Sequence, residues 1–204
     1  MARWGSCDYR QLQRLQKRME NLQSVELEDF CRKASAALAA RLLAKVIKRT
    51  PVGVVPKLGV RTRTVTGQSG KKYKLLTKAG DIYETYWAGY MGGTLRRGWT
   101  AKTEQEAQSG GQKTPEDYVR ALPIAKSGDT YTIEMVNPVS YASYVEFGHR
   151  QQPGRYVPAL GRRLKTAWVK GTFMLTISEQ EIRAQAPGLL QKMLEQAMRE
   201  AFRV

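Results

Sequence analysis

The side chains most able to do chemistry in this chain are its one histidine, His149, and its two cysteines, Cys7 and Cys31. A nucleophilic enzyme needs a base beside its nucleophile, and a zinc site needs about four closely spaced ligands. His149 stands next to Arg150 with no Gly-x-Ser-x-Gly motif in the chain, and the cysteines are far apart. We therefore expect no catalytic residue, no metal and no cofactor, and we expect Cys31 to be a reduced, buried side chain of a helix.

Two further patterns are similar to reactive sites. Residues 67–72 read Gly-Gln-Ser-Gly-Lys-Lys, with too few residues between the glycines for a phosphate-binding loop and Lys72 where Ser or Thr should stand. Glu134 and Glu146 fall on adjacent predicted strands, where they could form an acid pair. We favour an arginine across a subunit contact as the partner of Glu146. The sequence thus indicates a structural or binding protein and no enzyme.

The charge of the chain is strongly positive and unevenly placed. The net charge is +16, and residues 54–82 carry seven basic side chains against Asp81 alone. Such an excess favours a polyanionic neighbour such as nucleic acid. The alternative, which stays open, is that the charge serves solubility or pairs with acidic patches on a partner. No apolar run is long enough to span a membrane, and the start of the chain lacks a signal peptide, so we expect no membrane contact.

Helical patterns stand at both ends of the chain. Residues 8–22 repeat apolar side chains at helical spacing, namely Leu12, Leu15, Met19 and Leu22. A second helix, capped by Ser24, should run through Val46 and end at Pro51. A last helix should start at the capping box Ser178–Glu181 and break at Pro187.

The middle of the chain reads as short strands and loops. Residues 54–92 begin with a long basic excursion that can form a hairpin, and residues 95–99 alternate like a strand. Residues 103–116 read as a mobile loop, and deleting Glu104 to Glu116 should leave the fold intact. Residues 119–126 and 130–136 should form a hairpin, followed by an antiparallel strand over 141–147. The predicted fold is a single α+β domain over residues 1–204, with a small antiparallel sheet of about four strands, long N-terminal and C-terminal helices and long basic loops.

The stretch 137–148 reads Asn-Pro-Val-Ser-Tyr-Ala-Ser-Tyr-Val-Glu-Phe-Gly. Read as a strand, it has tyrosines on both faces and needs neighbours on both. It is similar to the signature Asn-x-x-x-Tyr-Ala-x-x-Val-Glu-Phe-Gly of the head–tail joining, neck or tail-completion proteins of long-tailed bacteriophages. Two earlier blocks resemble the same family: a helix closed by Thr50-Pro-Val, and Gly93-Thr-Leu-Arg-Arg-Gly-Trp99. The stretch 171–179, Gly-Thr-Phe-Met-Leu-Thr-Ile-Ser-Glu, also looks like the longer variants found in contractile-tailed phages and phage-like prophage elements.

The resemblance implies a structural protein of the virion, assembled in the bacterial host cytoplasm. Its copies would form a ring, usually hexameric, in the neck around the DNA channel. Its partners would be itself, tail terminator or tail tube and sheath proteins, the head-closure connector and, transiently, genomic DNA. The family usually places the second block soon after the first, whereas here residues 54–92 intervene as a basic insertion. A free nucleic-acid-binding module is the alternative function.

We assign candidate residues to two contacts. Those expected at the subunit interface are Tyr141, Tyr144, Glu146, Phe147, Leu95, Arg97 and Trp99. Those expected to contact the DNA channel or a partner are Arg61, Arg63, Lys71, Lys72, Lys74, Arg150 and Arg155. Substituting Glu146 or Phe147 should impair assembly more than folding.

Overall fold

The computed structural model describes residues 27–111 and 113–201. As predicted, the described chain is α+β, with small antiparallel sheets and long helices near both ends. It divides into two compact units. The described residues of the first unit are 27–44, 114–135 and 179–201, and those of the second are 45–111, 113 and 136–178. The helix predicted over 8–22 and the cap predicted at Ser24 lie outside the described residues.

Helix α2 (Leu27–Arg49) confirms the long helix predicted before Pro51. Acidic residues occupy its first turn and basic residues its last, as the helix dipole favours. In the first unit its buried positions are small or aliphatic: Ala34, Ala39, Ala40 and Leu43.

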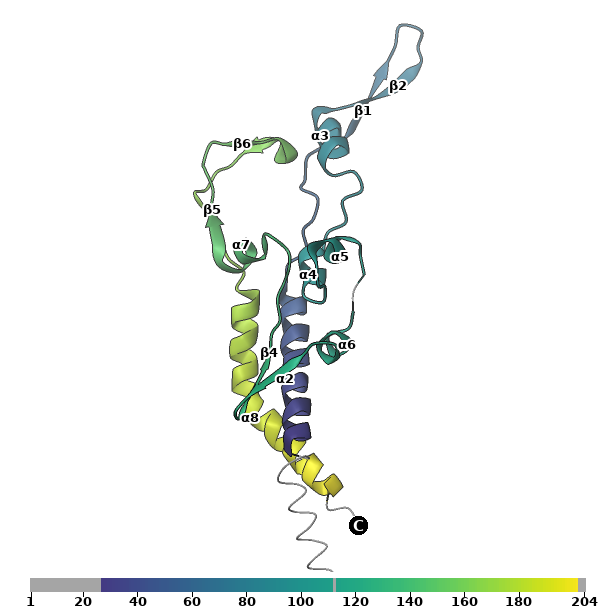
Figure 1. Cartoon of the computed structure of the whole chain (residues 1–204). Coiled ribbons are helices and arrows are strands. Elements are labelled where there is room, and N and C mark those ends of the chain that lie inside the picture. Colours follow the sequence, from purple (N-terminus) through teal and green to yellow (C-terminus); the bar gives the residue numbers. More distant parts are fainter. Residues whose placement is uncertain (1–26, 112, 202–204) are drawn as a thin grey trace, which may run out of the picture. The chain divides into compact units, whose positions relative to one another are not determined.

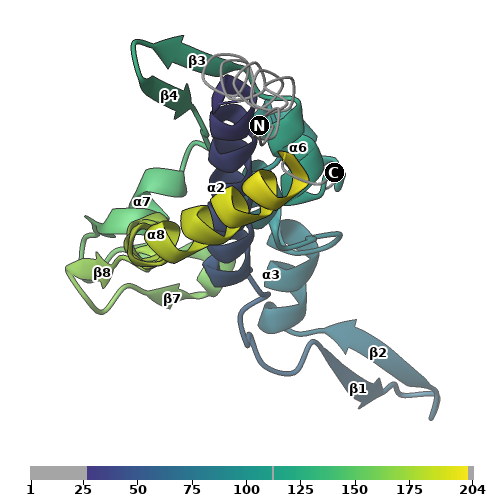
Figure 2. The ribbon, with the colours of Figure 1, turned by 90° about the horizontal axis from the view of Figure 1, so that it is seen from below.

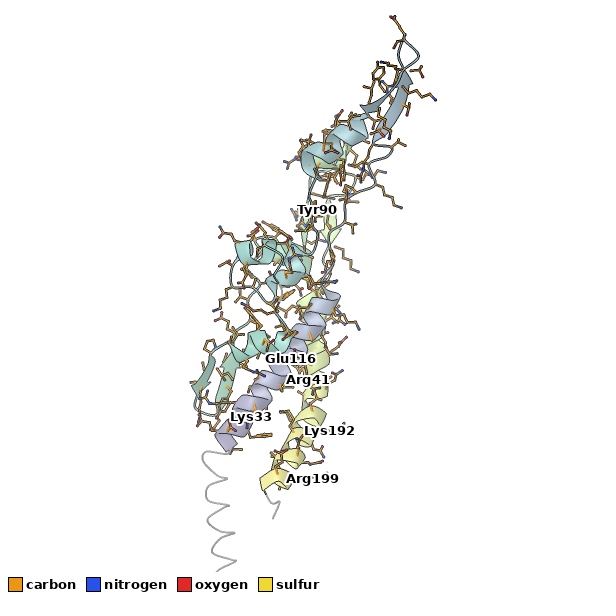
Figure 3. All side chains as sticks on the ribbon, turned by 90° about the vertical axis from the view of Figure 1, so that its right-hand side faces the viewer. Lys33, Arg41, Tyr90, Glu116, Lys192 and Arg199 are labelled. Atoms are coloured by element: carbon orange, nitrogen blue, oxygen red, sulfur yellow. The ribbon has the colours of Figure 1, made fainter. Side chains whose placement is uncertain are left out.

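Helix α8 (Met174–Ala201) runs through Pro187, so the predicted break there is wrong. Pro187 is exposed, so water can bond the backbone carbonyl that this proline leaves without a donor. The predicted start at Ser178 is also wrong, because Ser178 Oγ donates to Met174 O at 2.6 Å from within the helix. In the first unit α8 lies beside α2 and antiparallel to it, as the labelled Lys33 and Arg41 of α2 and Lys192 and Arg199 of α8 show (Figure 3).

The first unit is completed by helix α6 (Pro115–Arg120) and the strands β3 (Ile124–Ser127) and β4 (Thr130–Ile133). The two strands form the predicted hairpin, with shorter strands than expected. Lys126 Nζ contacts Glu28 Oε2 at 2.8 Å, and Arg32 donates to Ile124 O at 3.4 Å. These contacts hold the hairpin beside the first turns of α2 (Figure 2).

The second unit contains three more antiparallel strand pairs. They are β1 (Thr62–Thr66) with β2 (Lys72–Leu76), β5 (Gly148–Arg150) with β8 (Trp168–Lys170), and β6 (Tyr156–Val157) with β7 (Arg162–Arg163). Its short helices are α3 (Lys78–Tyr86), α4 (Thr94–Gly98), α5 (Glu104–Gln108), α7 (Ala142–Phe147) and the 3-10 turn η2 (Pro158–Leu160). Because every sheet of the described residues has two strands, the predicted addition of a third antiparallel strand over 141–147 to the β3–β4 hairpin is wrong.

Two segments predicted as strands are helices. Residues 95–99 lie in and just after α4, and residues 142–147 form α7. In so short a window, apolar residues four positions apart fit both a strand and one face of a helix. Leu95 and Trp99 have that spacing and are both buried. Tertiary contacts therefore decide between the two structures.

The segment 103–116, predicted as a loop without regular structure, contains α5. Thr103 caps this helix by accepting a hydrogen bond from Glu106 N at 3.2 Å. Ala107 is fully buried, and its carbonyl accepts from Arg97 Nε at 2.8 Å. The prediction that removal of this segment leaves the fold intact is therefore replaced by the expectation that its removal disturbs the second unit.

Candidate functional site

The sequence blocks at Thr50 and at 93–99 meet in the second unit. Thr50 is fully buried, and its hydroxyl donates to Val46 O at 2.7 Å and accepts from Trp99 Nε1 at 2.8 Å. Its carbonyl accepts two hydrogen bonds from the guanidinium of Arg96, at 2.7 and 3.1 Å. Pro51 ends the helical hydrogen bonding immediately after Thr50, so the turn presents both oxygens to the second block.

The block that begins at Asn137 joins the same place. Asn137 Nδ2 donates to Leu95 O at 2.9 Å, and Asn137 Oδ1 accepts from Val139 N at 3.1 Å. A Cβ at Gly98 would overlap Asn137 Oδ1 and the buried Val139, so this position requires glycine. All three blocks thus meet in one cluster of buried and half-buried residues, which we call the motif junction (Thr50, Leu95–Trp99 and Asn137–Val139).

Glu146 is buried and caps the start of α8 within the same chain. Its carboxylate accepts from Leu175 N and Thr176 N, each at 2.9 Å, and from Thr176 Oγ1 at 2.7 Å. A carboxylate suits this position, because the first backbone N–H groups of a helix lack partners within the helix and carry partial positive charge. The hydrogen bonds shown for Glu146 come from α8 of the same chain. The arginine across a subunit contact stays a prediction.

The neighbouring α7 residues face the solvent. Tyr141, Tyr144 and Phe147 recur every third residue and are 41%, 58% and 61% exposed. Desolvation, followed by the influence of Tyr90, raises the pKa of the Tyr141 phenol above its ordinary value. We call these three side chains the α7 aromatic face. It is an exposed apolar surface held in place by the buried Glu146.

The other candidates for the subunit interface have partners inside the chain. Leu95 and Trp99 belong to the motif junction. Arg97 donates to Gly92 O at 3.0 Å as well as to Ala107 O. Their assignment to an interface stays a prediction, and the surface available for one is the α7 aromatic face.

The predicted basic contacts are all exposed. Five of them belong to the hairpin of β1 and β2, which projects beyond α3 (Figure 1). Every residue of both strands is exposed. The register places Val65, Tyr73 and Leu75 on one face with Arg63, and Lys72 and Lys74 on the other. The hairpin therefore has one mostly apolar face and one basic face.

The base of this hairpin is fixed to the second unit. The guanidinium of Arg61 stacks on the ring of Tyr83 in α3, 3.4 Å from its centroid. Trp87 Nε1 donates to Ala159 O at 2.7 Å, and Arg162 Nη2 donates to Lys57 O at 3.1 Å. Arg150 and Arg155 lie elsewhere, at the end of β5 and in the loop before β6. Five of the basic candidates therefore lie in the hairpin of β1 and β2, and the other two, Arg150 and Arg155, lie outside it.

The described residues show no constellation for catalysis. His149 packs edge-on against Tyr144, with 5.8 Å between ring centroids. No group of three or more His, Cys, Asp or Glu in the described part of the chain could hold a metal ion. None of the described helices is long and apolar enough to cross a membrane.

Thr50, Arg96 and Asn137 hold the motif junction together, and none of them was predicted individually from the sequence. The sequence did contain a signal for these residues, because each stands in one of the three blocks that resemble the family. Thr50 and Asn137 each stand beside a proline, where a polar residue is often present for its backbone contacts, and both donate to backbone carbonyls here, as Arg96 also does.

Comparison with known proteins agrees with the arrangement of these blocks. Residues 13–148 match the family of bacteriophage HK97-gp10-like tail components. No curated protein and no solved structure matches the chain significantly. The match spans well over half of the chain and includes the whole motif junction and the α7 aromatic face. The chain belongs to the HK97-gp10-like family of phage tail components.

Proposed function

We propose that this chain is a structural protein of the phage neck, whose copies form a ring that joins the tail to the head connector around the DNA channel. The resemblance to neck proteins favours a six-membered ring. Family membership supports a tail component of the virion. The observation that best supports ring formation is the exposure of the three side chains of the α7 aromatic face. Nothing in this function requires turnover, and the motif junction is suited to holding a subunit rigid.

The α7 aromatic face is large enough to be part of an interface. Aromatic side chains bury about 150–250 Å² each when covered. With roughly half of each exposed, the three residues offer on the order of 300 Å². A standard interface takes about 800 Å² from each partner, so other surfaces must contribute. The basic hairpin is a second contact in this proposal, toward an acidic partner in the neck or toward passing DNA.

The test is assembly measured on variants that still fold. Phe147→Ser and Tyr144→Ser should shift the chain from rings to monomers in sedimentation and negative-stain images, with an unchanged melting transition. Tyr156→Ser is the matched control, because Tyr156 is also an exposed tyrosine (42%) of the second unit. A wild-type chain that stays monomeric at all concentrations and is absent from purified particles would refute the ring.

A free nucleic-acid-binding module is the second candidate, favoured by the exposure of all five basic residues of the hairpin. It requires tight binding to duplex DNA with a steep salt dependence. A channel protein must let DNA pass, so we expect weak binding. Fluorescence anisotropy with a labelled duplex at two salt concentrations separates the two functions.

A further inference from the structure

The hairpin of β1 and β2 has an apolar face that the described part of the chain leaves open. Val65, Tyr73 and Leu75 point to one side of the hairpin and are 37%, 51% and 46% exposed. We call these three side chains the hairpin apolar face. Arg63 pairs with Leu75 and lies on the same side, at the end of the face nearer to α3.

Hydrogen bonds fix the shape of this hairpin at both of its ends. At the tip, Gly67 N donates to Lys71 O at 2.8 Å and Gly70 N donates to Gly67 O at 3.0 Å. At the base, Thr77 N donates to Arg61 O at 2.9 Å. A two-stranded hairpin is at best marginally stable in water unless it packs against a further strand or a helix. The hairpin apolar face should therefore be covered by a partner.

Duplex DNA does not suit this face. Phosphate groups are bound by cations and hydrogen-bond donors, whereas the face consists of three apolar side chains beside one cation. Lys72 and Lys74 point to the other side of the hairpin. The two sides can therefore make an apolar contact and a polyanion contact at the same time.

The α7 aromatic face has the character that the hairpin apolar face lacks a match for in its own chain. It is an exposed helical surface, made of Tyr141, Tyr144 and Phe147. Glu104 lies at its beginning, because the Glu104 carboxylate accepts from Ser140 N at 3.3 Å and from Ser140 Oγ at 3.4 Å. The surface is thus aromatic with a carboxylate at one end.

The charges at the ends of the two faces are complementary. Arg63 is exposed and Glu104 is half-buried, and neither forms an ion pair with another residue of the described ranges. Arg97 also lies near Tyr141, and its guanidinium donates to two backbone carbonyls. The Glu104 carboxylate is therefore able to take a cation from another molecule.

A second copy of the chain supplies both surfaces at once. In one copy the hairpin contacts α3 and α7 contacts β5, and both faces stay exposed. A contact between two different surfaces of identical subunits is heterologous, and such contacts close into rings when the rotation between neighbours allows it. Each copy would then give its hairpin to one neighbour and receive the hairpin of the other.

The area of the two faces agrees with this role. The hairpin apolar face offers on the order of 200 Å², from half of one aromatic side chain and parts of two aliphatic ones. With the α7 aromatic face, the contact buries on the order of 500 Å². A standard interface buries about 1,600 Å², of which about 57% is apolar. This contact therefore supplies roughly half of the apolar area that an interface needs.

We propose that the hairpin apolar face of one copy packs on the α7 aromatic face of the next copy, with Arg63 paired to Glu104 of that neighbour. The inference rests on the ring proposed above and names the two surfaces that close it. Lys72 and Lys74 stay on the open side of the docked hairpin, where they can meet DNA or an acidic partner.

Charge reversal tests the predicted ion pair, with sedimentation velocity as the measurement. Arg63→Glu and Glu104→Arg should each raise the concentration at which half of the chains are assembled by about tenfold or more, because like charges then meet. The variant with both changes restores opposite charges and should assemble within about threefold of wild type. Lys74→Glu is the matched control, because it makes the same change on the other side of the hairpin and should leave assembly unchanged.

The outcomes separate this contact from the ring itself. Restored assembly in the variant with both changes supports the contact. Wild-type chains that stay monomeric at all concentrations refute the ring and the contact together. Wild-type rings that persist equally in Arg63→Glu refute the contact alone, and so does a double variant as impaired as the single ones.

Cross-linking tests the same contact without weakening the ion pair. In a full-length Cys7→Ser, Cys31→Ser background, Val65→Cys chains mixed with Tyr144→Cys chains before assembly should be joined into dimers by a short bismaleimide. Thr64→Cys, on the other side of the hairpin, should be joined to Tyr144→Cys far less. Dimers formed by Val65→Cys alone show that two hairpins pair and overturn the proposal. A cross-link within one chain carrying both cysteines places the hairpin on its own α7, which also overturns it.

Discussion

The indole Nε1 of Trp99 donates a hydrogen bond to Thr50 Oγ1 at 2.8 Å, and both side chains are buried. This contact joins the end of α2 to the end of α4 across 49 positions of the sequence. We expect Thr50→Val to lower the free energy of unfolding by about 1–3 kcal/mol, because the buried indole N–H loses its acceptor. Urea unfolding followed by tryptophan fluorescence measures this change.

The control for that variant is Thr64→Val, on an exposed strand of the basic hairpin, which should change stability by no more than about 0.5 kcal/mol. In the Trp99→Phe background, Thr50→Val should lower the free energy of unfolding by less than it does in the wild-type chain, since no buried indole N–H is then left without an acceptor. Additive losses in this cycle would show that the hydrogen bond contributes little.

Glu146 and Phe147 are adjacent in sequence and should respond differently to substitution. The expectation from the sequence that both act mainly on assembly is therefore kept for Phe147 alone. Glu146→Ala leaves three hydrogen bonds at the start of α8 unmade, so we expect a loss of about 1–3 kcal/mol in unfolding free energy. Phe147→Ala removes an exposed side chain and should lower stability by about 0.5 kcal/mol or less. Thermal melting and sedimentation on the same samples separate folding from assembly. Equal melting temperatures for the two variants would argue against the capping role.

Gly188 lies inside α8 with no neighbouring atoms within 4 Å of the place a Cβ would take. Gly188→Ala should therefore raise stability by about 0.5–1 kcal/mol, because alanine loses less backbone entropy in a helix. Gly98→Ala is the opposite case, since its Cβ would overlap Asn137, and it should destabilise the chain. A melting temperature that falls in Gly188→Ala would mean that the helix is interrupted there after all.

The basic hairpin should be dispensable for folding. We expect the triple variant Lys71→Gln, Lys72→Gln and Lys74→Gln to keep the wild-type melting transition, since all three side chains are exposed. If the hairpin binds DNA, the slope of log affinity against log salt should fall by about 0.9 for each phosphate that is no longer neutralised. A variant with Arg150→Gln and Arg155→Gln tests the separate basic pair. An unchanged slope in the triple variant would rule out DNA binding through these lysines.

The contact of Glu28 with Lys126 should make stability depend on pH. The hydrogen bond from Lys126, followed by that from Arg32, lowers the pKa of Glu28. A carboxylate with a lowered pKa stabilises the fold above its unfolded pKa, and this stabilisation is lost as pH falls through its folded pKa. Glu28→Gln should thus melt below wild type at neutral pH, and the difference should vanish in acid. A difference in melting temperature that does not change with pH would contradict this assignment.

Long periodic patterns were readable from the sequence. The helix ending before Pro51, the hairpin of β3 and β4 and the helical C-terminal segment are all present, because each has many repeats of its pattern or a clear turn signal. The three blocks also identified the family through residue types and spacing alone. The basic charge of residues 54–82 was readable in the same way, and their exposed hairpin agrees with it.

Short segments were decided by contacts that the sequence does not display. Residues 95–99 and 142–147 fit a strand as well as a helix, and the contacts of Trp99 with Thr50 and of Glu146 with α8 accompany the helical form. The start of α8 is a further case, because its cap comes from a carboxylate 30 positions earlier in the chain. The sequence by itself determined which residues repeat, which carry charge and which family they resemble. Only the tertiary structure decided which of them are buried together, because a buried polar group must find its partner wherever in the chain that partner lies.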